Sequence, residues 1–232
     1  MHRVQIGIIG FGTVGSGTAE VLLKNRDLIR GRSGVDIHIK VIADLNLRWD
    51  RGLNLEGIRL TEEAMEIVED PEIQIVVELI GGLTTAKEYV TEAIRRGKHV
   101  VTANKALLAH YGEELFSLAQ RHNVLIGFEA SVGGGIPIIT AIQTGLTGNR
   151  ITKLMAILNG TSNYILTRMR SELLPYQEVV EEAVRLGFAE DPPTLDVDGT
   201  DVAHKLVILM ALFYGMWFPL EEIYREGIQE IT

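Results

Sequence analysis

The sequence predicts an α/β protein. Through the first 130 residues, short β-branched runs alternate with segments of helical periodicity, which is typical of a parallel sheet. A glycine-rich turn follows the first run, and a second glycine-rich segment at 131–137 begins a region with a different residue pattern. We therefore expect a Rossmann-type doubly wound parallel sheet in a dinucleotide-binding domain (1–130), followed by an α+β substrate-binding and catalytic domain (131–232).

Composition excludes several classes of protein. The 232 residues carry a net charge of −9, which argues against a nucleic-acid partner. Cysteine is absent, so disulfides, thiolate metal sites and cysteine nucleophiles are excluded. No signal peptide is visible, and no apolar run reaches the roughly 18 residues that a membrane span requires. We expect a cytoplasmic protein with no membrane partner.

The expected elements of the first domain follow from periodicity and from turn residues. Strands are expected at residues 4–9, 35–42, 73–80, 99–102 and 124–128. Helices are expected from the glycine turn to about residue 26, from residue 61, and over residues 86–96 and 111–120. We expect an extra polar loop at 26–34, which lengthens the gap between the first two strands.

The first glycine turn has the pattern G-x-G-x-x-G. It comprises Gly10, Phe11, Gly12, Thr13, Val14 and Gly15. Glycine is required for a tight turn, for close approach of a pyrophosphate to the backbone and for close helix–strand packing. The following helix N-terminus offers N–H groups to the phosphates. The position between strand and helix favours dinucleotide binding over a purely structural turn.

Ligands of an open parallel sheet bind at the carboxyl ends of its strands. The residues expected at that edge are Gly10, Asp44, Gly81, Thr102 and Glu129. Asp44 can accept hydrogen bonds from the ribose hydroxyls and would repel a 2′-phosphate, which favours NAD over NADP. Arg48 could oppose this preference or be a solvated loop charge. Lys105 follows Thr102 closely, so we expect it near the cofactor rather than on a remote surface.

The second domain begins with an expected helix at 138–146 and a strand at 150–158. Helices are then expected over 164–171, over 177–186 with Gly187 as its cap, and from about 198 to 214. The polar turn at 159–163 could cap the following helix or face a polar ligand. In the last helix, the expected buried face comprises Val202, Leu206, Leu209 and Phe213.

Five acidic residues precede Lys205 between residues 187 and 206: Glu190, Asp191, Asp196, Asp198 and Asp201. Asp201 and Lys205 are four residues apart and share one helix face. A carboxylate beside an ammonium keeps the lysine charged, as a proton donor requires, and clustered carboxylates attract a substrate ammonium. A helix-surface ion pair and a divalent-metal site are the alternatives. His204 is expected to be packed or solvated rather than catalytic.

Five motifs occur in order across almost the whole chain. They are GFGTVG (10–15), VTANK (101–105), EASVGGGIP (129–137), LNGT (158–161) and the stretch GFAEDPPTLDVDGTDVAHK (187–205). In this combination the chain resembles homoserine dehydrogenase. The resemblance implies reversible, nicotinamide-dependent reduction of L-aspartate 4-semialdehyde to L-homoserine, in threonine, methionine and isoleucine biosynthesis. Aspartate-semialdehyde dehydrogenase uses the same aldehyde but requires a cysteine.

The resemblance also implies residue roles. Lys205 would donate a proton to the carbonyl oxygen, and Lys105 would lie beside nicotinamide and substrate. Glu190 would bind the substrate amino group and lie at the cofactor, which Gly187 would also touch. The remaining expected substrate-binding residues are Asp196 and Asp201. Where NADP-using members carry arginine, this chain has Ala43, which supports NAD or dual use.

A monovalent cation site, usually for sodium, is implied at the hinge. It maps to Glu129, Val132, Gly134 and Ile136, largely through carbonyl oxygens. The resemblance further suggests a homodimer formed through the second domain. Family members continue beyond the position of residue 232, so we expect the second domain to be incomplete at its C-terminus. The alternative to a dehydrogenase is a truncated nucleotide-binding homologue without full turnover.

Overall fold

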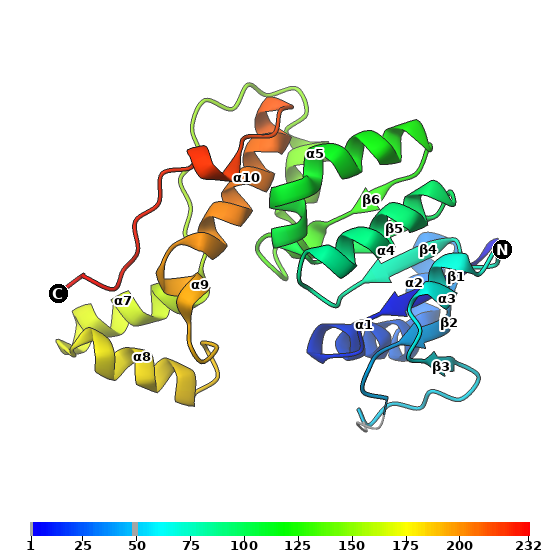
Figure 1. Ribbon diagram of the computed structural model, residues 1–232, viewed down its shortest axis with the longest axis horizontal. Helices are drawn as coiled ribbons and strands as arrows, with labels where there is room; N and C mark the ends of the chain where they lie inside the picture. The colour runs from blue at the N-terminus through cyan, green and yellow to red at the C-terminus, as the bar shows by residue number, and fades with distance from the viewer. Residues whose placement is uncertain (1, 48–50) are drawn as a thin grey trace. The chain divides into compact units, whose positions relative to one another are not determined.

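The structure is a computed structural model that describes residues 2–47 and 51–232 (Figure 1). The chain divides into two compact units, residues 1–131 and 132–232. The sequence places the boundary at 130/131, one residue from this division. No helix within the described ranges is long and apolar enough to cross a membrane.

A six-stranded parallel sheet forms the centre of the first unit. Its strands are β1 (His2–Ile9), β2 (Val35–Ala43), β3 (Arg59–Thr61), β4 (Ile75–Glu78), β5 (His99–Thr102) and β6 (Ile126–Gly127). The spatial order β3-β2-β1-β4-β5-β6 is that of a doubly wound dinucleotide-binding sheet, so this fold prediction is confirmed. The three-residue β3 was not expected, because it is too short to show a periodicity.

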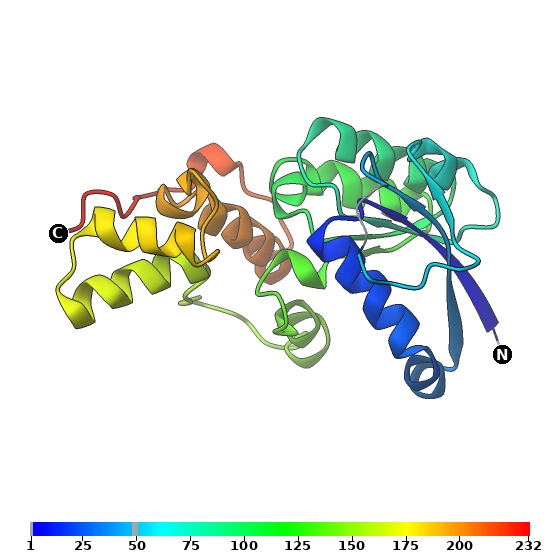
Figure 2. The same ribbon diagram turned by 90° about the horizontal axis from the view of Figure 1, so that it is seen from below.

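Helices cover both faces of this sheet. They are α1 (Thr13–Lys24), α2 (Arg26–Ser33), α3 (Met65–Glu69), α4 (Thr84–Arg95) and α5 (Lys105–Arg121), with a 3₁₀ turn η1 (Glu129–Ser131). One apolar core packs against α1, and another packs against α3, α4 and α5. Figure 2 shows α1 on one side of the strands and the α4 and α5 helices on the other. The sheet is therefore buried on both faces, as its β-branched strands require.

The order of the strands fixes where a ligand can bind. β1 pairs in parallel with both β2 and β4. On one side of β1 the sheet continues through β2 to β3, and on the other it continues through β4 and β5 to β6. This reversal is the topological switch point, outside which doubly wound proteins bind their ligands. The loops at 10–12, 44–47 and 79–83 all leave the sheet at that carboxyl edge.

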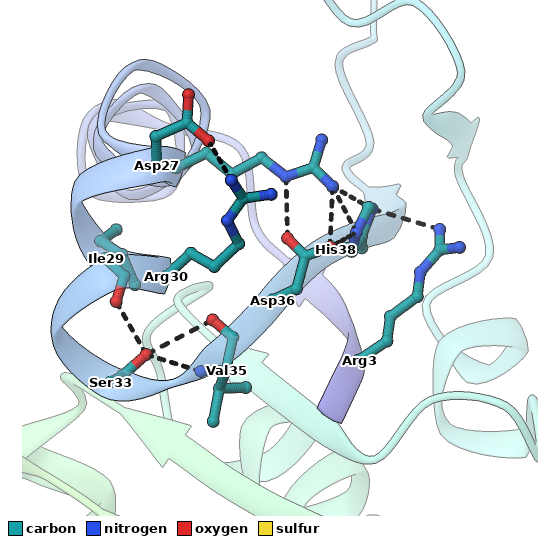
Figure 3. Close-up of polar contacts among 9 residues, drawn as sticks. Arg3, Asp27, Ile29, Arg30, Ser33, Val35, Asp36 and His38 are labelled. Atoms are coloured by element: carbon teal, nitrogen blue, oxygen red, sulfur yellow. Dashed lines mark hydrogen bonds and ion pairs between the residues drawn. The ribbon is translucent and has the colours of Figure 1, made fainter. Parts of the chain in front are cut away.

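Residues 26–33 form helix α2, where the sequence predicts a polar loop over 26–34. The helix buries no residue and ends at Gly34, whose φ of 72° is left-handed. Charged contacts hold it against β2: Arg26 donates to both carboxylate oxygens of Asp36, at 3.0 and 3.1 Å. Figure 3 shows His38 beside Asp36, with Arg3 of β1 reaching the same ring. Apolar periodicity could not reveal a helix held by ion pairs.

The second unit contains helices only within its described residues. They are α6 (Ile138–Thr140), a π-helical turn η2 (Ala141–Gly145), α7 (Gly160–Glu172), α8 (Tyr176–Arg185), α9 (Thr194–Val197), α10 (Thr200–Tyr214) and a 3₁₀ turn η3 (Leu220–Glu222). An apolar core joins α7, α8 and α9. The strand expected over 150–158 is not formed. A strand needs a hydrogen-bonding neighbour, and the described part of this unit offers none.

Candidate active site

The three glycines of the first turn have three different environments. Gly10 has a φ of 98°, and a Cβ there would lie 2.7 Å from the Leu79 carbonyl. A Cβ on Gly15 would lie 1.9 Å from the Gly10 carbonyl oxygen, so helix and turn pack in direct backbone contact. A Cβ on Gly12 would meet no atom of the described residues within 4 Å. Two glycines are thus required by the fold, whereas Gly12 leaves open backbone where a phosphate can approach.

The start of α1 provides the donors for such a phosphate. Gly12 is the N-cap of α1, and no side chain among the described residues caps this end. The first N–H groups of a helix have no intrahelical partner, so they are the donors on offer here. Thr13 and Val14 are exposed there, and Phe11 is buried in the core beneath α1. The expected binding residues therefore present backbone rather than side chains, and they fit a pyrophosphate.

Asp44 directly follows β2 and contacts the glycine turn. Its carboxylate accepts the Phe11 N–H at 2.5 Å and the Asn46 N–H at 2.7 Å. The side chain is thereby fixed beside the turn, at the position expected for a ribose-binding acid. The predicted influence of Arg48 lies outside the described residues.

A buried network that sequence reasoning missed links the ends of β4 and β5. Glu78 is fully buried and accepts hydrogen bonds from the N–H groups of Ile80 and Gly81, at 3.0 and 3.3 Å. It also accepts from the Thr102 hydroxyl at 2.6 Å. Burial raises the pKa of Glu78 above its ordinary value, and these donors oppose the rise. In sequence, an acid at the end of an apolar strand gives no sign of this arrangement.

Asn104 extends this network to Lys105. The Asn104 N–H donates to the Thr102 hydroxyl oxygen at 2.9 Å, and its side-chain amide donates to the Gly82 carbonyl at 2.7 Å. Its Oδ1 accepts the Leu107 N–H at 3.0 Å and so caps α5. Lys105 is the first residue of α5 and is half-buried. The Thr102 side chain is committed to this network, which holds the Lys105 backbone at the carboxyl edge.

In the second unit, Asp201 and Lys205 form a mostly buried ion pair on α10. The Lys205 Nζ lies 2.6 Å from Asp201 Oδ2, and the two side chains are 16% and 4% exposed. The ammonium also donates to the Leu158 carbonyl at 2.7 Å. The alternative of a solvated helix-surface pair is therefore wrong. A buried ammonium held by one carboxylate and one carbonyl has a defined direction, as proton transfer requires.

Asn159 joins this pair to a second acid, and it lies in the turn for which the sequence leaves two roles open. Its amide donates to Asp201 Oδ2 at 2.8 Å and to Asp196 Oδ1 at 2.6 Å. Its Oδ1 accepts the Ser162 N–H at 2.7 Å and caps α7. The turn therefore both caps the helix and contacts the predicted substrate-binding acids.

The buried face of α10 differs from the expected one. Its buried residues are Asp201, Ala203, His204, Val207, Ile208 and Leu209. Of the four predicted core positions, only Leu209 is buried, because the Asp201 network turns the polar side of the helix inward. His204 is buried, in agreement with a packed rather than solvated residue.

The remaining predicted site residues lie in exposed turns. Gly187 has a φ of 75° and its N–H donates to the Val184 carbonyl at 3.0 Å, so it ends α8 as expected. The hydroxyl of Thr161, in α7, donates to the carbonyl of Phe188, the residue after Gly187, at 2.6 Å. Glu190 follows with an exposed side chain. These contacts tie the segment that leads to Glu190 to the α7 turn that carries Asn159.

The expected cation ligands fall on both sides of the division between the units. Glu129 begins η1, whereas Val132 is buried and Gly134 and Ile136 are exposed. The Ile136 N–H donates to the Gly133 carbonyl at 2.7 Å. Across the described ranges, no group of three or more histidine, cysteine or acidic side chains could hold a metal ion. The carbonyl-based cation site stays a prediction.

The glycine turn, Asp44 and the strand order define the first unit as a dinucleotide-binding domain of the Rossmann type. Comparison with protein families specifies the class further. Residues 10–129 match the family model "Homoserine dehydrogenase, NAD binding domain", and residues 137–232 match the model "Homoserine dehydrogenase". The chain belongs to the homoserine dehydrogenase family.

Individual relatives agree with this assignment. The chain is 44% identical over 232 residues to homoserine dehydrogenase of Bacillus subtilis (strain 168). The matched region covers 100% of this chain and 54% of the relative. The crystal structure of a homoserine dehydrogenase from Thiobacillus denitrificans is 50% identical, with a TM-score of 0.96, and is matched over 100% of this chain and 54% of that one. The chain thus spans about half the length of these relatives.

A shorter relative is matched more completely. The structure of a hyperthermophilic archaeal homoserine dehydrogenase in complex with NADPH is 32% identical, with a TM-score of 0.84. The match covers 99% of this chain and 75% of that one. Both units of the chain therefore have counterparts in solved proteins of one family.

Proposed function

We propose that the chain catalyses the reversible, NAD(P)-dependent interconversion of L-aspartate 4-semialdehyde and L-homoserine. The observation that carries this proposal is the mostly buried Asp201–Lys205 pair, in a chain whose other unit has a dinucleotide-binding turn. Membership of the homoserine dehydrogenase family supports the choice of substrate. Such an enzyme would belong to the biosynthesis of threonine, methionine and isoleucine.

Lys205 is the proposed proton donor. A nicotinamide cofactor would supply the hydride when bound, and the substrate oxygen would then carry negative charge. A lysine ammonium at that oxygen stabilises the charge and donates its proton, and in homoserine oxidation the neutral amine takes the hydroxyl proton. Asp201, at 2.6 Å from Nζ, keeps the ammonium charged and oriented.

The acidic residues and the second lysine bind and orient the substrate. Glu190 and Asp196 have the charge to bind the substrate ammonium, and Glu190 and Gly187 are proposed also to contact the cofactor. Lys105, held at the strand edge by the Asn104 cap, is proposed to orient the substrate and to assist proton transfer. Its position at the start of α5 supports this role.

We propose NAD as the preferred cofactor, with NADP as an alternative. Asp44 at the end of β2 favours free ribose hydroxyls, and Ala43 offers no charge to a 2′-phosphate. The NADPH complex of the archaeal relative shows that the family also accommodates the phosphorylated cofactor.

A bound sodium ion, a homodimer and a cytoplasmic location complete the proposal. The sodium ion would use the carbonyl-rich segment of Glu129, Val132, Gly134 and Ile136. Its test is activity in sodium buffer against choline buffer of equal ionic strength. The dimer is tested by light scattering of the purified chain.

The activity itself is tested by homoserine oxidation with NAD⁺ and with NADP⁺. Lys205→Ala should lower turnover by at least about 100-fold and leave dinucleotide binding unchanged, because general acid–base catalysis contributes about 10²–10⁴-fold. Lys205→Arg should also be inactive, since arginine retains the charge opposite Asp201 but does not release its proton. Lys153→Ala, at an exposed lysine of the same unit, is the matched control. Unchanged turnover in both Lys205 variants would remove Lys205 as the donor.

A nucleotide-binding homologue without full turnover is the second candidate. The chain spans about half the length of its curated relatives, so the activity of this portion alone separates the two candidates. If the chain binds either dinucleotide but homoserine yields no reduced nicotinamide at any pH, this candidate is correct.

A further inference from the structure

Both polar atoms of the Asn159 carboxamide make hydrogen bonds inside the second unit. Asn159 is 5% exposed. The two amide hydrogens go to two different carboxylates, those of Asp196 and Asp201, and the carbonyl oxygen goes to the backbone of α7. The side chain therefore has one structural contact and two contacts with predicted site residues.

The backbone beside Asn159 reaches the same ion pair. The carbonyl of Leu158 accepts from Lys205 Nζ, whose other acceptor is Asp201 Oδ2. The two consecutive residues 158 and 159 thus hold both members of the pair. Any change in the direction of the Asn159 side chain would alter the surroundings of the ammonium.

The Asn159 carboxamide also offsets the repulsion between two carboxylates. Asp196 and Asp201 both face one small group, and two nearby carboxylates repel each other. The neutral amide donates one hydrogen to each carboxylate, and Asp201 Oδ2 accepts both from this amide and from Lys205 Nζ. In the described residues, Asp196 Oδ2 has no hydrogen-bond partner, so this oxygen is available to a cationic group.

We infer that Asn159 is a positioning residue that couples the acid Asp196 to the Asp201–Lys205 pair, so that ammonium binding and proton donation share one rigid geometry. This inference rests on the proposed function. The competing explanation is that Asn159 acts only as the N-cap of α7. The two explanations differ in one testable respect: a cap needs only the side-chain acceptor, whereas coupling needs the two donors.

Asn159→Ser separates the two roles, because serine caps helices about as well as asparagine but is too short to replace both amide donors. In homoserine oxidation by the 232-residue chain, we expect kcat to fall about 10- to 100-fold, KM for homoserine to rise about 10-fold, and the dinucleotide Kd to stay unchanged. Asn163→Ser, at an exposed position four residues on, should match the unsubstituted chain. Wild-type kinetics in Asn159→Ser would overturn the inference.

A second measurement does not depend on turnover. The side-chain carboxyl ¹³C resonances of Asp196 and Asp201 at pH 7 should both move in Asn159→Ser and stay in place in Asn163→Ser, because only the first variant removes their amide donors. Unchanged resonances in Asn159→Ser would overturn the inference even if the chain were inactive. If that variant does not fold, the unsubstituted chain is measured instead: both Asn159 amide hydrogens should exchange slowly with solvent, and fast exchange would exclude the coupling.

Discussion

At the scale of single residues, Asp44 connects the cofactor turn to the proposed choice of cofactor. Asp44→Ala should weaken NAD⁺ binding by about 10- to 100-fold, because a hydrogen bond to a charged group contributes about 1.5–3 kcal/mol. NADP⁺ should lose less, since its 2′-phosphate is repelled by the carboxylate. Titration calorimetry with both dinucleotides measures the two changes.

The control for that substitution is Asp44→Asn. Asparagine keeps an oxygen that can accept the Phe11 N–H, which the aspartate accepts at 2.5 Å, so the turn remains supported. Equal losses of NAD⁺ and NADP⁺ affinity in the alanine variant would show that Asp44 supports the turn and does not bind ribose.

Glu78 gives a pH-dependent prediction. Its folded pKa is raised above the ordinary 4.5 by burial, so the folded state holds this proton more tightly than the unfolded state. The contribution to stability is complete below about pH 4.5 and is lost as pH rises through the folded pKa, by about 1.4 kcal/mol per unit of pKa difference. Glu78→Gln cannot ionise and should gain stability relative to the unsubstituted chain as pH rises.

Urea unfolding of both proteins at pH 5 and pH 8 tests this prediction. Other groups titrate equally in the two chains, so the difference between their free energies of unfolding isolates Glu78. A difference that does not change with pH would show that the Glu78 carboxyl has the same pKa in both states.

At the scale of elements, α2 depends on its ends rather than on an apolar face. Gly34 ends it at a φ of 72°, which costs an L-residue about 1–2 kcal/mol. Gly31 lies inside the helix, and a Cβ there would meet nothing within 4 Å. We expect Gly34→Ala to destabilise the chain by about 1 kcal/mol and Gly31→Ala to stabilise it by about 0.5–1 kcal/mol.

Urea unfolding and hydrogen exchange of residues 26–33 measure both effects. The two substitutions add the same methyl group to the same helix, so each is the control for the other. Changes of the same sign would mean that the helical backbone of this segment does not persist in solution.

These elements show what sequence patterns can and cannot predict. The buried strands β1, β2, β4 and β5 were predicted because apolar β-branched runs between turn residues report burial directly. Helix α2 was not, because its contacts are ionic. The segment at 150–158 has a strand-like alternation, but pairing depends on a neighbour that alternation does not report.

The same distinction holds for the site. The spacing of Asp201 and Lys205 predicted their contact, since residues four apart on a helix are neighbours. The sequence does not reveal the role of Glu78 and leaves two roles open for Asn159, because their side-chain partners lie 24 and 37–42 residues away in the sequence. Only folding brings these donors and acceptors together.

At the scale of the whole molecule, each unit has its own core. The two cores of the first unit use residues no later than Phe128, and Ser131 ends it with a side-chain hydrogen bond to the Phe128 carbonyl at 2.6 Å. All six strands of the sheet lie before residue 131. A fragment of residues 1–131 therefore retains every hydrogen-bonded strand pair and both apolar cores of the first unit.

We expect this fragment to unfold in one cooperative transition and to bind NAD⁺ within about tenfold of the whole chain's affinity. A modest loss is expected because the proposed contacts of Gly187 and Glu190 are removed. It should not oxidise homoserine, since Lys205 is absent. Gly12→Ala in the fragment is the control: its methyl group would occupy the open backbone proposed for the pyrophosphate, so binding should be lost while folding persists. A folded fragment that binds no dinucleotide would show that the second unit supplies most of the binding energy, and the glycine turn alone would not define the cofactor site.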